Sequence, residues 1–450
     1  MSYSSNYLGE DKISKLIIRL SIPATIGMII NALYNVVDTI FIGRGVNSLA
    51  IGALAICFPI QMILSSLAQM VGIGSASIIS RSLGEKNKSY ADEIAGNSII
   101  LILMINILFS TIGLIFLDPI LSLFGSTTEI LPYAQDYMKI IFLGNIYYGL
   151  VVSYNNIIRS EGKAKTSMAL VMIGTGLNVI LDPIFIFGFK MGIQGAAIAT
   201  ILSQFITLIF VLNYIVRGNS SLNIKFENLK LNVKNSKEIM KIGVPSFVRQ
   251  VGGSVLAIVV NNSLKFYGGN IAISAFGIAN RVLMFIFMPM FGIVQSLQPI
   301  VGFNYGAKKY DRVKEATLLS IKTIIVLSSI GWLIIQLFSP YIIRIFTPDI
   351  QVIPTGILII KTITFAIPVV GIQIIGTTIF QALGKSKPAM ILSLLRQFIM
   401  LIPMILILPL LMDNGVFGIA VSYPISDVIS TVISLFLIRH EFREMDKIMA

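Results

Sequence analysis

The 450-residue chain is 55% hydrophobic and only 12% charged, a composition outside the range of soluble proteins. Its mean hydropathy of +0.87 comes from apolar runs along the whole chain, each long enough for the roughly 20 residues that cross a bilayer. A single cysteine, Cys57, and a single histidine, His440, exclude a disulfide framework, an iron-sulfur cluster and a histidine-rich metal centre. The net charge of +13 does not indicate a nucleic-acid partner, because the basic residues lie in short segments between apolar runs.

The apolar runs predict an all-α polytopic membrane protein with about twelve transmembrane helices. The predicted spans begin near Leu16, Leu49, Ile94, Leu131, Ser167, Ile193, Ile239, Ile271, Ala316, Ile353, Pro388 and Val416. Four prolines, Pro23, Pro245, Pro289 and Pro368, fall within these spans, and we expect them to kink their helices.

The distribution of basic residues predicts the orientation of the spans. Residues 1–15 lack the basic start, short apolar core and cleavage site of a signal peptide, so no cleaved signal is expected. With a cytoplasmic N-terminus, the cytoplasmic connections hold most of the Lys and Arg residues, including Arg81, Arg159, Lys308 and Lys385. The positive-inside rule therefore predicts a multi-pass protein of the plasma (inner) membrane with both termini in the cytoplasm.

The sequence aligns with itself at an offset of 222 residues, which pairs Pro23 with Pro245 and Gly84 with Gly306. One offset held over six spans indicates a duplication. Each half contains an even number of spans, so the two halves enter the membrane in the same sense and should be related by an axis along the membrane normal. The predicted units are a six-helix lobe at 1–216, a cytoplasmic linker at 217–241, and a six-helix lobe with a cytoplasmic tail at 242–450. A central cavity is expected between the lobes.

Polar residues of the first and fifth spans are the main candidates for a functional site. Four of them share one face of the first span: Asn31, Tyr34, Asn35 and Asp38. On the fifth span, Asn178 and Asp182 lie one turn apart. The alternative to a functional site is that these residues only form polar contacts that hold neighbouring helices together. A carboxylate, however, carries a desolvation cost that a changeable protonation state or a bound cation would justify. Asp38 and Asp182 are therefore predicted to form an ion-coupling site that exchanges a proton or binds a cation.

Only the first half contains this acidic pair, because Val260 and Met404 occupy the matching positions of the second half. The second half instead carries these charged residues in or near its spans: Arg249, Arg281, Lys322, Lys361, Arg396 and Asp427. Those at helix ends can extend to the membrane surface. A basic residue paired with Asp427 is a structural alternative to a role in coupling.

Other polar and flexible residues of the spans are weaker candidates. Tyr137 and Asn155 on the fourth span are polar interior residues. Met284 and Met288 belong to a Met- and Phe-rich eighth span, a pattern typical of packing or lipid contact, or of an adaptable cavity wall. Together with Asn31 they are candidate substrate contacts.

Motifs for enzymatic chemistry are incomplete. Gly384-Lys385-Ser386 resembles the end of a phosphate-binding loop, but Ile379 stands where that loop needs glycine. A membrane transferase or aspartyl protease could use Asp38 and Asp182, yet their neighbours are amides and hydroxyls without a nucleophile arrangement. The protein is therefore predicted not to be an enzyme and to need no cofactor.

The chain carries residues that match the sequence motifs of one protein family: Pro23, Gly27, Asp38, Phe41, Gly43, Leu49, Ala50, Arg81, Gly84, Ala91, Gly162, Gly174, Asn178, Asp182, Pro183, Gly192, Gly195, Ala196, Ala197 and Thr200. Over essentially its full length the chain resembles the multidrug and toxic compound extrusion (MATE) transporters. The resemblance implies twelve helices in two lobes and a monomer in the lipid bilayer. It also implies export of small amphipathic, mostly cationic drugs in exchange for H+ or Na+ by alternating access.

The resemblance also implies a polar network in the first lobe. The positions that match it are Asp38, Asn178, Asp182, Thr200, Tyr137 and Asn155, with Tyr34 and Asn35 in support. If Na+ is the coupling ion, its ligands would be Asp38, Asn178, Asp182 and Thr200. Some branches of the family use acidic residues of the second lobe as a sodium site, but here that lobe is poor in acidic residues within the membrane, with Asp427 as the main candidate. A lipid-linked precursor flippase of the same superfamily, expected to have a strongly cationic cavity, and a membrane-embedded enzyme are the alternatives.

Overall fold

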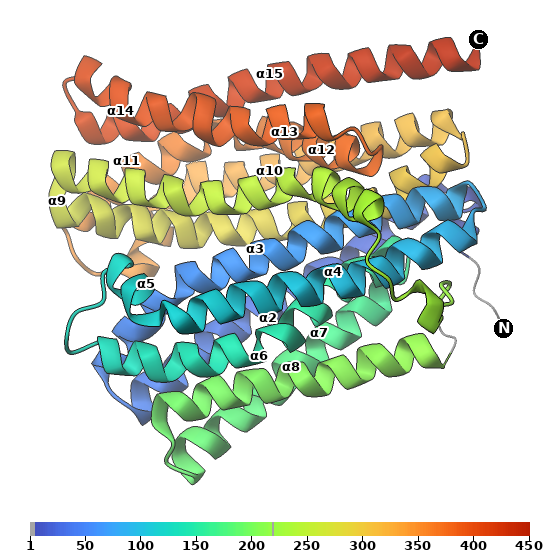
Figure 1. Ribbon diagram of the computed structural model, residues 1–450. Coiled ribbons are helices and arrows are strands. Elements are labelled where there is room, and N and C mark those ends of the chain that lie inside the picture. Colours follow the sequence, from blue (N-terminus) through green and yellow to red (C-terminus); the bar gives the residue numbers. More distant parts are fainter. Residues whose placement is uncertain (1–4, 218–219) are drawn as a thin grey trace.

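The computed structural model describes residues 5–217 and 220–450. Residues 1–4 of the predicted first lobe and 218–219 of the predicted linker lie outside the described residues. Within the described ranges the chain forms helices and no strand, which confirms the predicted all-α class. Figure 1 shows the helices of the first half, blue to green, beside those of the second half, yellow to red.

The first lobe contains α1 (Tyr7–Glu10), α2 (Ile13–Gly45), α3 (Ser48–Gly84), α4 (Lys88–Ile115), α5 (Leu117–Leu123), α6 (Leu131–Ser160), α7 (Ala164–Pro183), the π-helix η1 (Ile184–Gly188) and α8 (Gly192–Val216). Asparagine caps begin two of these helices: the side chain of Asn47 accepts a hydrogen bond from the Ala50 amide, and that of Asn87 from the Tyr90 amide. Such caps satisfy amides that have no partner within the helix.

The second lobe begins after a short 3-10 helix, η2 (Phe226–Asn228), in the connecting segment. It contains α9 (Val233–Gly306), α10 (Tyr310–Phe346), α11 (Val352–Ile363), η3 (Thr364–Ala366), α12 (Ile367–Ala382), α13 (Ser386–Leu394), the π-helix η4 (Leu395–Leu401), α14 (Ile402–Leu411) and α15 (Gly415–Met449). Asn232 caps the start of α9. Residues 233–241, which the sequence places in the linker, are therefore already helical.

Ten segments of the described chain are long and apolar enough to cross a membrane. One of them, α9, changes direction at Gly269 and so contains two passes. The φ of Gly269 is +60°, a left-handed value that glycine adopts without steric strain. The more polar α6 has the length of a further pass. These twelve passes begin close to the predicted positions. Pro23, Pro245 and Pro289 lie inside helices as predicted, whereas Pro368 lies in the first turn of α12, directly after η3.

Turns at equivalent positions of the two lobes have the same backbone form. α3 ends at Gly84 and α9 at Gly306, which are 222 residues apart. Two residues later in each turn, Lys86 and Lys308 have φ values of 60° and 57°. A left-handed residue just after a helix ends the helix and turns the chain, so both lobes use the same termination at this point.

Candidate functional site

A cavity of about 1210 Å³ lies between the two lobes. Its walls come from α2, α3, α6, α7 and α8 of the first lobe and from α9, α11, α12, α13, η4 and α15 of the second. The predicted substrate contacts Asn31, Met284 and Met288 all line this cavity. Its charged lining residues are Asp38, Arg159, Arg249, Arg396 and Asp427.

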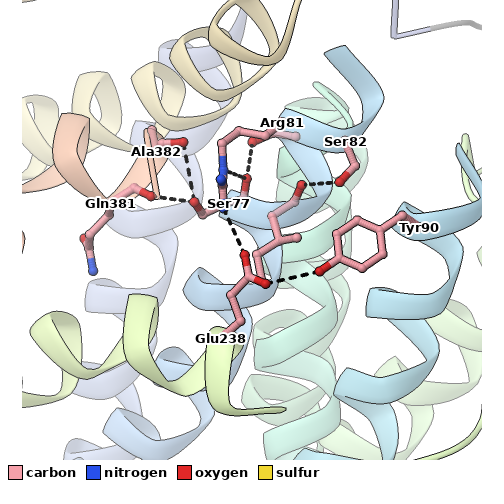
Figure 2. Close-up of polar contacts among 9 residues, drawn as sticks. Ser77, Arg81, Ser82, Tyr90, Glu238, Gln381 and Ala382 are labelled. Atoms are coloured by element: carbon pink, nitrogen blue, oxygen red, sulfur yellow. Dashed lines mark hydrogen bonds and ion pairs between the residues drawn. The ribbon is translucent and has the colours of Figure 1, made fainter. Parts of the chain in front are cut away.

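The lobes meet at the end of the molecule where α3 and α9 terminate. Figure 2 shows the polar contacts there, where the Ser77 hydroxyl on α3 donates to the carbonyl of Gln381 on α12 at 2.5 Å. Glu238 on α9 accepts from the Tyr90 hydroxyl at 3.1 Å and pairs with Arg81 at 3.6 Å. These contacts join the lobes and close this end of the cavity.

Glycines allow the backbones of α3 and α9 to touch at the same end. A Cβ on Gly243 would lie 1.9 Å from the carbonyl oxygen of Met70, and one on Gly306 would lie 2.0 Å from that of Arg81. No larger residue fits at either position without moving a helix. Contact between the lobes at this end therefore depends on the lack of a side chain at Gly243 and Gly306 as well as on the polar contacts.

The carboxyl groups of Asp38 on α2 and Asp182 on α7 meet within hydrogen-bonding contact. Asp38 is 9% exposed and Asp182 fully buried. Oδ1 of Asp38 has no hydrogen-bond partner among the described residues. Two ionised carboxylates at this separation would repel each other, so the contact requires a shared proton or a cation.

Asn178 and Thr200 surround the inner member of this pair. The amide of Asn178 satisfies both of its neighbours when its nitrogen donates to Asp182 Oδ2 at 2.9 Å and its oxygen accepts from the Thr200 hydroxyl at 3.3 Å. The Tyr34 hydroxyl also contacts Thr200. The structure therefore places Asp38, Asp182, Asn178, Thr200 and Tyr34 in one connected network.

The remaining candidates of the first lobe bind other partners. Tyr137 accepts a hydrogen bond from Gln61 at 3.1 Å. Asn155 accepts from the Ser167 hydroxyl at 2.7 Å and donates to the Ser167 carbonyl at 3.1 Å. Asn35 donates to the backbone of Asn31, four residues earlier on the same helix. Tyr137, Asn155 and Asn35 all line the cavity, but among the described residues none of the three forms a hydrogen bond to either carboxyl group.

Gln61 and Ser167 are the partners that the sequence did not single out. Gln61 is an isolated amide in the apolar second span, and Ser167 is one of many hydroxyls at span ends. An uncharged polar residue in a span is common, so neither gives a distinctive signal.

The second lobe carries an ion pair in the cavity wall. Arg396 Nε donates to Asp427 Oδ1 at 2.6 Å, which confirms the pairing named as the structural alternative for Asp427. Arg159, from the first lobe, donates to Asn156 at 2.7 Å and also to Gln295. The carboxylate of Asp427 is thus already paired with the guanidinium of Arg396, which argues against a sodium site at Asp427.

Twelve passes in two lobes around a central cavity define this protein as a multi-pass membrane transporter. The MatE family model matches residues 23–184 and 245–407, so the chain belongs to the MatE family. The two matched segments begin at Pro23 and Pro245, the prolines paired by the offset of 222 residues. Proteins of this family are transporters, and the chain is not an enzyme.

Similar proteins cover nearly the whole chain. The chain is 30% identical over 432 residues to the multidrug export protein MepA of Staphylococcus haemolyticus, covering 96% of this chain and 94% of MepA. It is 28% identical over 412 residues to MepA of Staphylococcus aureus (strain MRSA252), covering 92% and 90%. A solved structure of a multidrug resistance MATE family transporter in an outward-facing conformation has a TM-score of 0.93 and 26% identity. That match covers 99% of this chain and 100% of the other.

Proposed function

We propose that this protein exports amphipathic, mostly cationic compounds from the cell in exchange for H+ or Na+ by alternating access. The observation that carries this proposal is the acidic pair: Asp38 borders the cavity, and Asp182 lies directly behind it. A cationic compound in the cavity and a coupling ion would both be attracted to the same carboxyl groups. The similarity to proteins named multidrug export proteins supports the same class of substrate.

Coupling requires that substrate affinity differ between the ion-loaded and ion-free states. A loaded pair, neutralised by a proton or a bound cation, has less attraction for a cationic substrate than an ionised pair. Loading from outside therefore favours release of the substrate, and unloading toward the cytoplasm restores a carboxylate that binds the next one. Because Asp38 lies on the cavity surface, competition for one carboxylate is sufficient for this exchange.

Protons alone are sufficient to load this pair, because one shared proton satisfies both carboxyl groups. The Asn178 amide fits either ion: with its nitrogen toward Asp182 it donates to that carboxyl group, and with its oxygen toward Asp182 it would add a ligand for a hard cation such as Na+.

The direction of the cavity follows from the closed end. Arg81 and Lys308 lie at the end where the lobes meet, and the positive-inside rule assigns that end to the cytoplasm. The cavity would then face the outside, as in the outward-facing transporter with a TM-score of 0.93. Both termini would lie in the cytoplasm of a plasma-membrane protein that acts as a monomer.

The charge of the cavity is less consistent with a lipid-linked precursor flippase. Three arginines and two aspartates line it, and one arginine is paired with an aspartate. A strongly cationic wall for a polyphosphate head group would carry an excess of several positive charges. Export of amphipathic cations therefore fits this cavity better.

Transport by the purified protein in liposomes tests the proposal. A fluorescent lipophilic cation is loaded, and its movement is followed under a pH gradient without sodium and then under a sodium gradient at constant pH. We expect movement under at least one gradient, and the pH gradient alone should suffice. Absence of movement under both gradients, with protein that is monodisperse and correctly inserted, would reject the exporter. Sodium binding by calorimetry at high pH, lost in Asp182→Asn, would identify Na+ as a coupling ion.

A further inference from the structure

Arg159 is a cation at the closed end of the cavity. The sequence counts it among the basic residues of a connection between spans, but the structure places it in the cavity lining, one residue before the end of α6. Its neighbour Asn156 lies against α3, where a Cβ on Gly72 would be 2.8 Å from the Asn156 amide nitrogen. Gly72 lies between Met70 and Gly74, both of which contact α9. Arg159 therefore lies at the level at which the two lobes close the cavity.

Polar side chains of other helices hold Arg159 across the seam between the lobes. Its guanidinium donates to Gln295 on the second pass of α9 and to the side chain of Asn156 at 2.7 Å. The Asn156 amide in turn donates to Gln69 on α3 at 2.9 Å. The Gln295 amide donates to the sulfur of Met28 on α2 at 3.3 Å. These contacts link four helices of the two lobes, and both hydrogen-bond partners of Arg159 among them are neutral.

No carboxylate compensates the charge of Arg159. No ion pair joins this arginine to any residue that the structure describes. Glu161, two residues later, lies outside the cavity lining and accepts hydrogen bonds from the Tyr214 hydroxyl at 3.3 Å and the Ser220 hydroxyl at 2.9 Å. Amide oxygens accept from the guanidinium without removing its charge, so this end of the cavity keeps a positive charge.

The acidic pair lies far from this charge, toward the other end of the cavity. The helix α2 begins at Ile13 beside the closed end, where the carbonyl of Leu8 accepts from Asn304 near the end of α9. Asp38 follows Ile13 by 25 residues, or about 37 Å of helix. A cation that enters from the open end therefore reaches Asp38 before it reaches Arg159.

We propose that Arg159 is a cation barrier: its fixed charge keeps protons and other cations that enter the cavity from passing through the closed end without export of a substrate. An arginine that lines a pore can exclude protons and cations by the same electrostatic effect. The inference rests on the proposed function, because a leak of cations would dissipate the gradient that drives export.

Proton leak through the purified full chain in liposomes tests the barrier. The liposomes contain the pH-sensitive dye pyranine and no drug, and a potassium gradient with valinomycin sets an inside-negative potential. We expect the parent protein to leak little more than protein-free liposomes. Arg159→Gln should raise the leak by about 10-fold or more, because a unit charge a few ångströms from the path is lost. Arg159→Met is a second neutral variant, and Arg159→Lys, which keeps the charge, should leak as little as the parent protein.

Variants of Gln295 separate the charge of Arg159 from the contact that it makes across the seam. Gln295→Leu removes this contact and keeps the charge, so the leak should stay close to that of the parent protein. Gln295→Glu strengthens the contact by adding an ion pair but neutralises the charge, so the leak should rise. A purely structural contact predicts the opposite order. Lys322→Gln removes a charge from an exposed position of α10 outside the cavity lining, and should not change the leak.

The outcomes distinguish the barrier from the exporter. Equal leak in the parent protein and in both neutral variants of Arg159, with monodisperse and correctly inserted protein, would overturn the barrier. A higher leak in Gln295→Leu than in Gln295→Glu would overturn it as well. Movement of a drug under a pH gradient, measured in the same liposomes, reports on the exporter separately. Absence of drug movement by the parent protein, together with a leak specific to the neutral variants, would reject the exporter while the barrier stands.

Discussion

Substitution of Gly243 by alanine should open the end of the molecule at which the lobes meet. The added Cβ would lie 1.9 Å from the Met70 carbonyl oxygen, whereas close carbon-oxygen contacts in proteins are about 3.3 Å or longer. The helices α3 and α9 must therefore separate by more than about 1 Å in the closed state. Overpacking of this kind typically costs about 1–3 kcal/mol, which corresponds to a shift of roughly 5- to 150-fold in a two-state equilibrium.

This cost applies to the state in which α3 and α9 touch, so the population should move toward a state in which they are apart. Spin labels on cysteines at Lys88 and Asp311, two exposed positions at this end of α4 and α10, report the separation of the lobes. Distances are measured by double electron-electron resonance in a background without Cys57. We expect Gly243→Ala to add a longer distance that is minor or absent in the parent protein.

A control on the second pass of α9 separates the clash from the added methyl group. At Gly277 a Cβ would meet no atom within 4 Å, so Gly277→Ala adds the same methyl group to α9 without a clash. Its distance distribution should match that of the parent protein. Gly74→Ala, whose Cβ would lie 2.1 Å from the Ile239 carbonyl oxygen, should act in the same direction as Gly243→Ala. Unchanged distances in both clashing variants, with folded protein, would refute the idea that glycine contacts close this end.

Two further predictions concern coupling and orientation. Asp38→Asn should abolish drug export by correctly inserted protein, because a neutral amide cannot cycle its charge. Export is measured in cells. The control is Asp118→Asn, which makes the same change at an exposed position of α5. Normal export by Asp38→Asn would remove that residue from the mechanism. Cysteines at Lys308 and Lys190, in a background without Cys57, should react from the cytoplasm and from the outside respectively. Outside labelling at position 308 would reverse the orientation.

Much of the fold is encoded locally and could be predicted. A bilayer-spanning helix needs about 20 apolar residues in sequence, so the spans could be located from composition alone. The stripe that contains Asp38 and the pair Asn178 and Asp182 were found because a charge at bilayer depth is rare and costly. Pairing of Asp427 with a basic residue was foreseen for the same reason, although only the structure identifies Arg396 as the partner.

The contacts between helices were decided by the tertiary structure. The sequence does not show that Gln61 binds Tyr137, that the Asn178 amide lies between Asp182 and Thr200, or that Gly243 lies against Met70. It identified Arg249 only as one of several basic residues near spans, with no measure of which were paired. The physical reason is that these contacts depend on how helices distant in sequence are rotated and packed against one another. Helical periodicity gives the face on which a residue lies, but not the helix that this face meets.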